Sequence, residues 1–287
     1  MPTGPSTSSR RAALPDAPIA VVTGAASGIG AACRTRLSGA GYTVIGVDQH
    51  EADVLADLGT VAGRETAVRA VTDACGGALA AVVTCAGLAG SPSRVGSLVA
   101  SVNYFGTVDF LGGLRPLLAR GGAAVAISSN STTVQPAIPA PLVAALLAHD
   151  EEGARTLADE AGSMVTYPAS KLALAHWVRA QATGDDWAGS GVRLNAIAPG
   201  MIETPMVTGM RADPEVGPLL DMLPIPIGRP GRPEEIAALV EFLLGPDAGY
   251  FCGSVVFCDG GSDALLRTTD WPAAWDISVR ELGRQLS

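Results

Sequence analysis

Short apolar runs rich in Val, Ile and Ala recur along the chain, and they alternate with longer stretches whose apolar residues follow a helical period. Buried parallel strands are apolar throughout, whereas surface helices are apolar at every third or fourth position. Strands are predicted at residues 19–23, 42–47, 52–58, 78–84, 123–127, 192–198 and 253–258. Helices are predicted between them, the main ones ending at about residue 38 or lying within 60–75, 97–120, 166–182 and 233–244. This alternation predicts an α/β fold: a single Rossmann-type, doubly wound parallel sheet with helices on both faces.

Two segments depart from the alternation. Residues 130–166 contain Pro136, Pro139 and Pro141, which exclude a strand, and then two short helical patterns at 142–148 and 151–161. We therefore expect a helical insertion before the helix at 166–182. Residues 201–232 are rich in Pro, Met and Gly, and we expect them to form a mobile lid over a substrate.

The two ends of the chain lie outside the predicted domain, which spans residues 18–267. Residues 1–17 are rich in Ser, Pro, Thr and Ala, which predicts a disordered tail. Residues 268–287 form a C-terminal tail whose two tryptophans, Trp271 and Trp275, pack either on a partner subunit or on the chain itself. No apolar stretch follows Arg10 and Arg11 as an export signal requires, and no segment resembles a membrane span. A cytoplasmic protein without membrane contact is expected.

A glycine-rich turn, Thr23-Gly24-Ala25-Ala26-Ser27-Gly28-Ile29-Gly30, follows the first predicted strand. Glycines let a backbone approach a pyrophosphate, and the next helix offers free N–H groups at its positive end. The turn and its flanking elements predict the first βαβ unit of a dinucleotide-binding fold. Asp48 ends the second strand of this unit. Its carboxylate can accept hydrogen bonds from both ribose hydroxyls and repels a 2′-phosphate, so NAD is favoured over NADP.

Tyr167 and Lys171 stand four residues apart in a predicted helix, so both side chains project from one face. Lys171 is the only lysine in the chain, where arginine supplies every other basic side chain. A nearby ammonium favours the phenolate and lowers the pKa of a tyrosine, which makes the phenol a general acid and base near neutral pH. The pair alone also fits a helix that merely covers its surface. The surrounding motifs favour the catalytic interpretation.

Composition excludes several classes of function. The net charge is −9 and no basic stripe is present, so a nucleic-acid partner is not expected. The five cysteines lack C-x-x-C spacing, and His50, His149 and His176 lack ligand spacing. No metal site is therefore predicted.

The motifs, taken in order, resemble those of the short-chain dehydrogenase/reductase family. They are Thr23-Gly24-x-x-x-Gly28-x-Gly30, Cys85-Ala86-Gly87, Asn103, Ser129, Tyr167-x-x-x-Lys171 and Pro199-Gly200. The resemblance covers about residues 18–266. Within the family, the helical insertion and the Asp259-Gly-Gly ending look most like bacterial 3α-hydroxysteroid dehydrogenase/carbonyl reductases.

The resemblance implies an NAD-dependent oxidoreductase that interconverts a secondary alcohol and a ketone. Tyr167 would be the catalytic acid and base, and Lys171 would lower its pKa and bind the nicotinamide ribose. Ser129, rather than the structural Ser128, would hydrogen-bond the substrate oxygen, and Asn103 would hold a water in a proton relay. The cofactor would contact Gly24, Ser27, Gly28, Ile29, Gly30, Asp48, Asp57, Leu58, Cys85, Ala86, Gly87, Tyr167, Lys171, Pro199, Gly200, Ile202 and Thr204.

Departures from the family pattern refine these expectations. The usual Asn-Asn-Ala-Gly turn is here Thr84-Cys85-Ala86-Gly87, which loses an amide that normally braces the sheet. The short interval from Gly87 to Asn103 reduces one wall of the cleft, and the lid is rich in methionine, so a hydroxysteroid or another bulky alicyclic substrate is favoured. A different ketone, such as a natural-product or acyl intermediate, stays open, as does a non-catalytic NAD-binding sensor. The insertion would cover a surface used for tetramers, so the resemblance implies a homo-oligomer, with a homodimer favoured.

Overall fold

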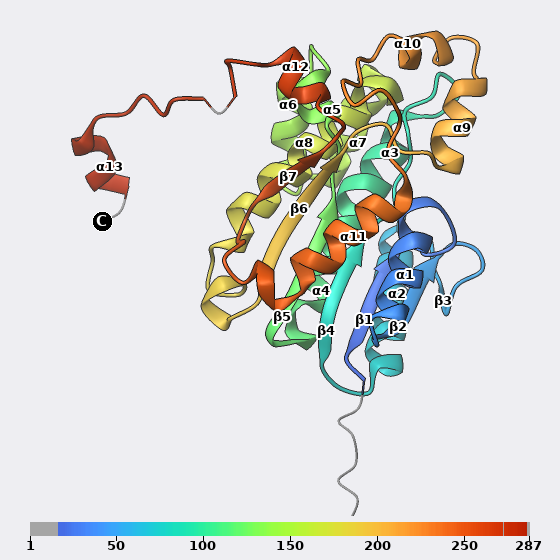
Figure 1. The fold of residues 1–287 in the computed structure, drawn as a ribbon, viewed down its shortest axis with the longest axis vertical. Helices are drawn as coiled ribbons and strands as arrows, with labels where there is room; N and C mark the ends of the chain where they lie inside the picture. Colours follow the sequence, from blue (N-terminus) through green and yellow to red (C-terminus); the bar gives the residue numbers. More distant parts are fainter. Residues whose placement is uncertain (1–16, 272, 286–287) are drawn as a thin grey trace, which may run out of the picture.

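The computed structural model describes residues 17–271 and 273–285. Their strands form one parallel sheet in the order β3-β2-β1-β4-β5-β6-β7 (Figure 1). The strand order reverses between β1 and β4, as it does in doubly wound sheets. The predicted fold class is therefore confirmed. The strands are β1 (Ile19–Thr23), β2 (Thr43–Asp48), β3 (Val54–Leu55), β4 (Leu79–Thr84), β5 (Leu118–Ile127), β6 (Arg193–Pro199) and β7 (Val255–Cys258).

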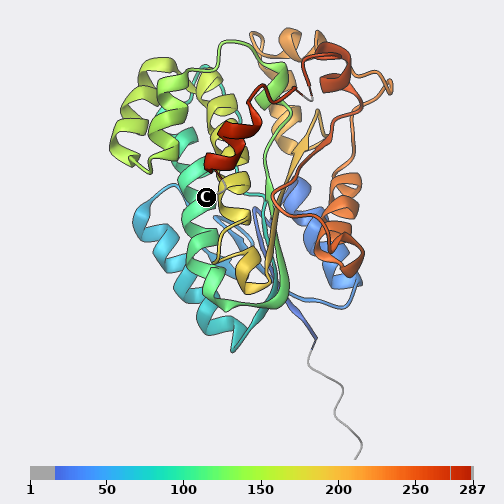
Figure 2. The ribbon, with the colours of Figure 1, turned by 90° about the vertical axis from the view of Figure 1, so that its left-hand side faces the viewer.

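Helices cover both faces of the sheet, so that three layers are visible in Figure 2. One face packs on α1 (Gly28–Gly39) and α11 (Pro233–Leu244), and the other packs on α2 (Val61–Cys75), α4 (Gly106–Leu114) and α8 (Ser163–Ala182). Burial from both sides explains why the central strands are apolar at every position rather than at alternate ones.

The long helix expected within residues 97–120 is broken and ends early. The chain forms α3 (Gly96–Ala100), a π-helical turn (Ser101–Phe105), α4 and a 3-10 turn (Arg115–Leu117). Pro116 lies in that last turn, where it removes a backbone donor and ends the helix. As a result, β5 begins at Leu118 instead of residue 123. The third strand is also shorter than expected, because only Val54 and Leu55 pair with β2.

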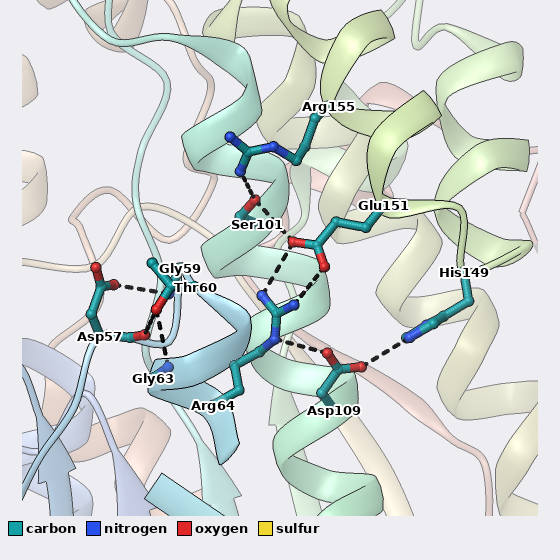
Figure 3. Close-up of polar contacts among 10 residues, drawn as sticks. All are labelled: Asp57, Gly59, Thr60, Gly63, Arg64, Ser101, Asp109, His149, Glu151 and Arg155. Atoms are coloured by element: carbon teal, nitrogen blue, oxygen red, sulfur yellow. Dashed lines mark hydrogen bonds and ion pairs between the residues drawn. The ribbon is translucent and has the colours of Figure 1, made fainter. Parts of the chain in front are cut away.

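The expected helical insertion contains α5 (Ser131–Val134), α6 (Ala140–Leu147) and α7 (Glu151–Ala161). A buried ionic network fixes the start of α7 to the body of the domain (Figure 3). Arg64 of α2, whose side chain is 4% exposed, pairs with both Glu151 and Asp109. His149 Nε2 lies 3.2 Å from the same Asp109 carboxylate. The two carboxylates offset the hydration that the Arg64 guanidinium loses on burial. The network can therefore lie between packed helices.

The expected lid contains α9 (Pro205–Ala212) and α10 (Gly217–Asp221), joined by irregular chain. After β7 come α12 (Ser262–Leu266) and an arm that leaves the body and ends in α13 (Val279–Gln285) (Figure 1). Trp271 and Trp275 in this arm are 49% and 67% exposed. The expected N-terminal tail lies, apart from Ala17, outside the described residues. Across the described ranges, no helix combines the length and the apolar character needed to traverse a bilayer.

Candidate active site

Two adjoining hollows open beyond the carboxyl ends of the strands, where doubly wound sheets bind their ligands. The glycine groove, of about 240 Å³, is lined by the glycine turn, by the end of β2 and by the turn after β4. The apolar cavity, of about 390 Å³, is lined by Ser129, Tyr167 and Lys171 on one side and by the lid on the other. Residues shared by both linings make the two hollows continuous: Ile29, Cys85, Gly87, Thr204 and Met206.

The glycine turn is held in a conformation that needs glycine. Gly24 and Gly28 have φ angles of 66° and 53°, values that side chains with a Cβ rarely adopt. A Cβ on Gly30 would lie 2.0 Å from the Gly24 carbonyl oxygen. The Thr23 hydroxyl accepts hydrogen bonds of 3.1 Å from the backbone N–H groups of Cys85 and Ala86. Sequence reasoning missed this bond, which ties the turns after β1 and β4 together where the family amide is missing.

Asp48 lies in the glycine groove as predicted. Its carboxylate accepts hydrogen bonds from the N–H groups of Ala26 and Gln49, at 3.1 Å and 2.7 Å. Leu58 also lines the groove, but Asp57 does not. The Asp57 carboxylate accepts a hydrogen bond from the Gly59 N–H at 2.9 Å, which stabilises its own turn. No lysine or arginine is among the described residues that line the groove.

Tyr167 and Ser129 meet at the wall of the apolar cavity. Burial raises the pKa of the Tyr167 phenol, and a hydrogen bond with the Ser129 hydroxyl lowers it. Ser129 Oγ also accepts a hydrogen bond of 3.1 Å from the Ser131 N–H. With Ser129 Oγ accepting this bond, the Ser129 proton is directed to the Tyr167 oxygen or to a substrate oxygen in the cavity. Ser128 donates instead to the Lys171 carbonyl at 2.9 Å, which fits the structural role expected for it.

Lys171 is buried below the junction of the two hollows. Its side-chain nitrogen donates to the Ile127 carbonyl at 2.8 Å, and burial lowers the pKa of the ammonium to about 8. Burial and the Ser129 hydrogen bond shift the Tyr167 pKa in opposite directions, and the effect of Lys171 on that pKa stays a prediction. Contact with the Cys33 thiol raises the pKa of Cys85, so this neighbour of Lys171 stays uncharged.

Asn103 lies in the π-helical turn before α4 and is fully buried. Its side chain accepts from the Leu88 N–H at 2.7 Å and donates to the Leu88 carbonyl at 2.9 Å. A Cβ built on Gly87 would lie 3.3 Å from Asn103 Oδ1 and 3.5 Å from Lys171 Nζ. Asn103, Lys171 and the turn after β4 thus meet at one point, and the relay role of Asn103 stays a prediction. π-Helical turns often occur at functional sites.

The remaining predicted cofactor contacts lie at the other side of the junction. Pro199, Gly200, Ile202 and Thr204 line the apolar cavity. The Thr204 hydroxyl accepts a hydrogen bond from the Val207 N–H at 3.3 Å and so caps α9, the first helix of the lid. The lid is therefore anchored at the edge of the glycine groove.

Comparison with known proteins identifies relatives of this site. A family model described as "Enoyl-(Acyl carrier protein) reductase" matches residues 152–263. The 3-alpha-hydroxysteroid dehydrogenase/carbonyl reductase of Comamonas testosteroni is 40% identical over 258 residues, which cover 88% of this chain and 99% of that protein. The cis-4-hydroxycyclohexanecarboxylate dehydrogenase of Sinomonas cyclohexanicum is 32% identical over 271 residues, covering 86% and 97%.

A solved structure matches over a similar range. The 3-alpha-hydroxysteroid dehydrogenase from Pseudomonas sp. B-0831, complexed with NADH, is 45% identical and superposes with a TM-score of 0.85, covering 88% of this chain and all of that chain. This chain belongs to the short-chain dehydrogenase/reductase family. The identification inferred from the motifs alone is thus confirmed.

Membership in the short-chain dehydrogenase/reductase family does not identify every residue that shapes the site. Val47, Gln49, Ala56 and Val102 line the glycine groove without having been predicted. Three of them lie at or near the ends of β2 and β3, so their position could have been read from the strand boundaries. Gln135 lines the apolar cavity and was also missed, because it lies in the insertion, where no family motif marks a position.

Proposed function

We propose that this protein interconverts a secondary alcohol and a ketone on a bulky alicyclic ring, with NAD(H) as the redox partner. One observation carries the proposal. The apolar cavity has one pair of touching hydroxyls, Ser129 and Tyr167, beside the opening into the glycine groove, and hydrocarbon side chains make up most of its other walls. Such a cavity suits a ligand that is mostly hydrocarbon around the oxygen that reacts.

The glycine groove fits a dinucleotide. Gly24, Gly28 and Gly30 let the chain fold tightly at the N-terminus of α1, where a pyrophosphate would bind, and Asp48 lines the groove where we expect a ribose. The carboxylate and the lack of a cation in the described lining favour NAD over NADP. The related Pseudomonas enzyme with bound NADH supports the same choice.

The bound nicotinamide would supply or accept the hydride, while residues of this chain handle the proton. In ketone reduction, the Tyr167 phenol donates its proton to the substrate oxygen, and Ser129 stabilises the charge that develops on that oxygen. Lys171 and Asn103 lie behind this pair, where we assign them to ribose binding and to the proton relay.

The substrate class rests on the cavity and on the relatives. The names of the Comamonas and Sinomonas proteins specify ring alcohols, and a volume of about 390 Å³ lies within the range of about 300–1,000 Å³ typical of small-molecule sites. The segment 201–232 would act as the substrate lid, since Met206, Met210 and Leu219 face the cavity. The acyl substrate named by the family model is the alternative that an assay must test.

We further propose a cytoplasmic homodimer. Strand β7 is an edge of the sheet, and the nearby Phe242 and Tyr250 are 42% and 103% exposed. Association through α11 and β7 would cover both side chains. Sedimentation of the purified protein tests this assembly, and a monomer at micromolar concentration would contradict it.

The function is tested by following NADH consumption with a steroid 3-ketone, a substituted cyclohexanone and a linear acetoacetyl thioester. We expect the cyclic ketones to be reduced with a kcat/KM at least about 100-fold above that of the thioester. NADPH should replace NADH poorly. Reduction of the thioester alone, or activity with NADPH alone, would overturn the proposal.

A further inference from the structure

Gln135 is a polar side chain of the apolar cavity for which neither the proposed reaction nor the protein's own hydrogen bonds account. Apart from the reacting pair, most polar side chains of its lining are engaged with the protein itself. The hydroxyls of Ser128, Thr204 and Ser262 donate to backbone carbonyls, and the Asn130 amide donates to Asp259. The half-buried amide of Gln135 has no hydrogen-bond partner among residues 17–271 and 273–285.

The backbone places Gln135 one helical turn beyond Ser131, the residue that contacts the catalytic Ser129. Ser131 begins α5 and donates its N–H to Ser129 Oγ at 3.1 Å. The Gln135 N–H donates to the Ser131 carbonyl at 3.3 Å, so the two residues lie one above the other on the same face. At about 1.5 Å of rise per residue, four residues separate them by about 6 Å. This rise, which starts at the residue bonded to Ser129, is comparable to the distance between two oxygens at opposite ends of a six-membered ring.

A second observation points to the same face of α5. The Ser131 hydroxyl is buried and is without a hydrogen-bond partner within the described part of the chain. A buried hydroxyl left unpaired costs about 1–3 kcal/mol. Ser131 and Gln135 therefore both have polar groups without a partner on one face of α5. These groups indicate that a polar ligand forms hydrogen bonds with this wall of the cavity.

Charge limits what that ligand group can be. Lys171 is the one ionisable cation in the described lining, and it is engaged with the Ile127 carbonyl. Aspartate and glutamate are missing from the same lining. An anionic or cationic substrate group would have no counter-charge here, whereas an amide pairs equally well with a neutral hydroxyl or carbonyl.

We propose that Gln135 is a specificity residue that hydrogen-bonds a second, neutral oxygen of the substrate, one ring length from the reacting oxygen. The inference rests on the proposed function and narrows its substrate class to alicyclic ketones and alcohols that carry a second hydroxyl or carbonyl. Loss of this bond affects dioxygenated substrates selectively, because the rest of the cavity is apolar.

The test uses two nearly isosteric ketones, 4-hydroxycyclohexanone and 4-methylcyclohexanone, with NADH. In the unmodified protein we expect a higher kcat/KM for the hydroxylated ketone. Gln135→Met keeps the length of the side chain without its amide, and it should lower the hydroxy-to-methyl ratio about tenfold, the effect of one lost hydrogen bond. Gln135→Glu keeps an acceptor for the hydroxyl and should retain the preference. Val134→Ile, on the same cavity wall, should leave the ratio within about twofold, since it changes shape but not polarity.

The outcomes separate the two proposals. Failure of the unmodified protein to reduce either ketone, or any steroid ketone, overturns the proposed function. Reduction of both ketones with a ratio that Gln135→Met leaves unchanged overturns only the role of Gln135. If Gln135→Met does not fold, a ratio that a folded Gln135→Leu variant leaves unchanged overturns the role equally.

Discussion

Replacing Lys171 with methionine should stabilise the folded protein at neutral pH while stopping turnover. The ammonium is buried, and burial lowers its pKa from 10.5 to about 8. Between these pH values the unfolded chain binds a proton at this site that the folded chain does not bind. Stability of the unmodified protein therefore rises with pH across this window. Below pH 8 both states are protonated, and the folded state carries the full cost of the buried charge.

The size of the effect follows from the shift. At about 1.4 kcal/mol for each pKa unit, the buried charge costs about 3 kcal/mol at pH 7. The variant also loses the hydrogen bond to Ile127, which is worth about 1 kcal/mol. Lys171→Met should therefore be about 2 kcal/mol more stable than the unmodified protein at pH 7. Raising the pH to 9.5 should reduce this difference by about 2 kcal/mol.

Urea unfolding of both proteins at pH 7 and pH 9.5, without cofactor, measures this difference directly. Lys171 is the only lysine, so no other lysine titrates in this range. Groups common to both proteins cancel when the two are compared at the same pH. A difference that stays constant, or that grows as the pH rises, would refute the reasoning that a buried charge is held here at the expense of stability.

Three further substitutions test the cofactor site and the fold. Asp48→Asn keeps the shape of the side chain and should shift the ratio of NADPH to NADH affinity at least about tenfold toward NADPH, as measured by fluorescence titration. Arg64→Met leaves two partly buried carboxylates without their cation (Figure 3) and should cost about 3–5 kcal/mol of unfolding free energy, whereas Arg69→Met, at a side chain 66% exposed, should change it by less than about 0.5 kcal/mol. Gly30→Ala should abolish NADH binding because its Cβ would clash with the glycine turn, whereas Gly39→Ala meets no atom within 4 Å and should stabilise α1 by up to about 1 kcal/mol.

The sheet and the main site residues could be predicted because local chemistry determines them. An apolar strand followed by a glycine-rich turn is typical of dinucleotide-binding folds and uncommon in other folds. Tyr167 and Lys171 lie four residues apart, and this spacing alone places both on one face of a helix. The segment carrying Asn103 was predicted as one unbroken helix, since a π-helical turn and an α-helix bury apolar residues at similar intervals. Pro116 was the local signal that could have corrected the boundary.

Features that depend on tertiary contacts were not accessible from the sequence. In the sequence, Arg64 lies in a helix whose pattern is typical of the protein surface. In the structure, its side chain is enclosed between α4 and α7. Arg193 similarly donates to four backbone carbonyls at and after the end of α11, including those of Leu243 and Gly245. The direction of the Lys171 ammonium toward Ile127 and the burial that raises the pKa of Tyr167 also follow from packing and not from spacing.

The most direct test of the central claim compares Tyr167→Phe with the unmodified protein in NADH binding and in turnover of a cyclic ketone. The phenol hydroxyl is the proton donor in this account, and the phenyl ring keeps the shape of the cavity. We expect the dissociation constant for NADH to stay within about threefold, and kcat to fall about 10²–10⁴-fold. Turnover that survives in Tyr167→Phe at the rate of the unmodified protein would contradict the account.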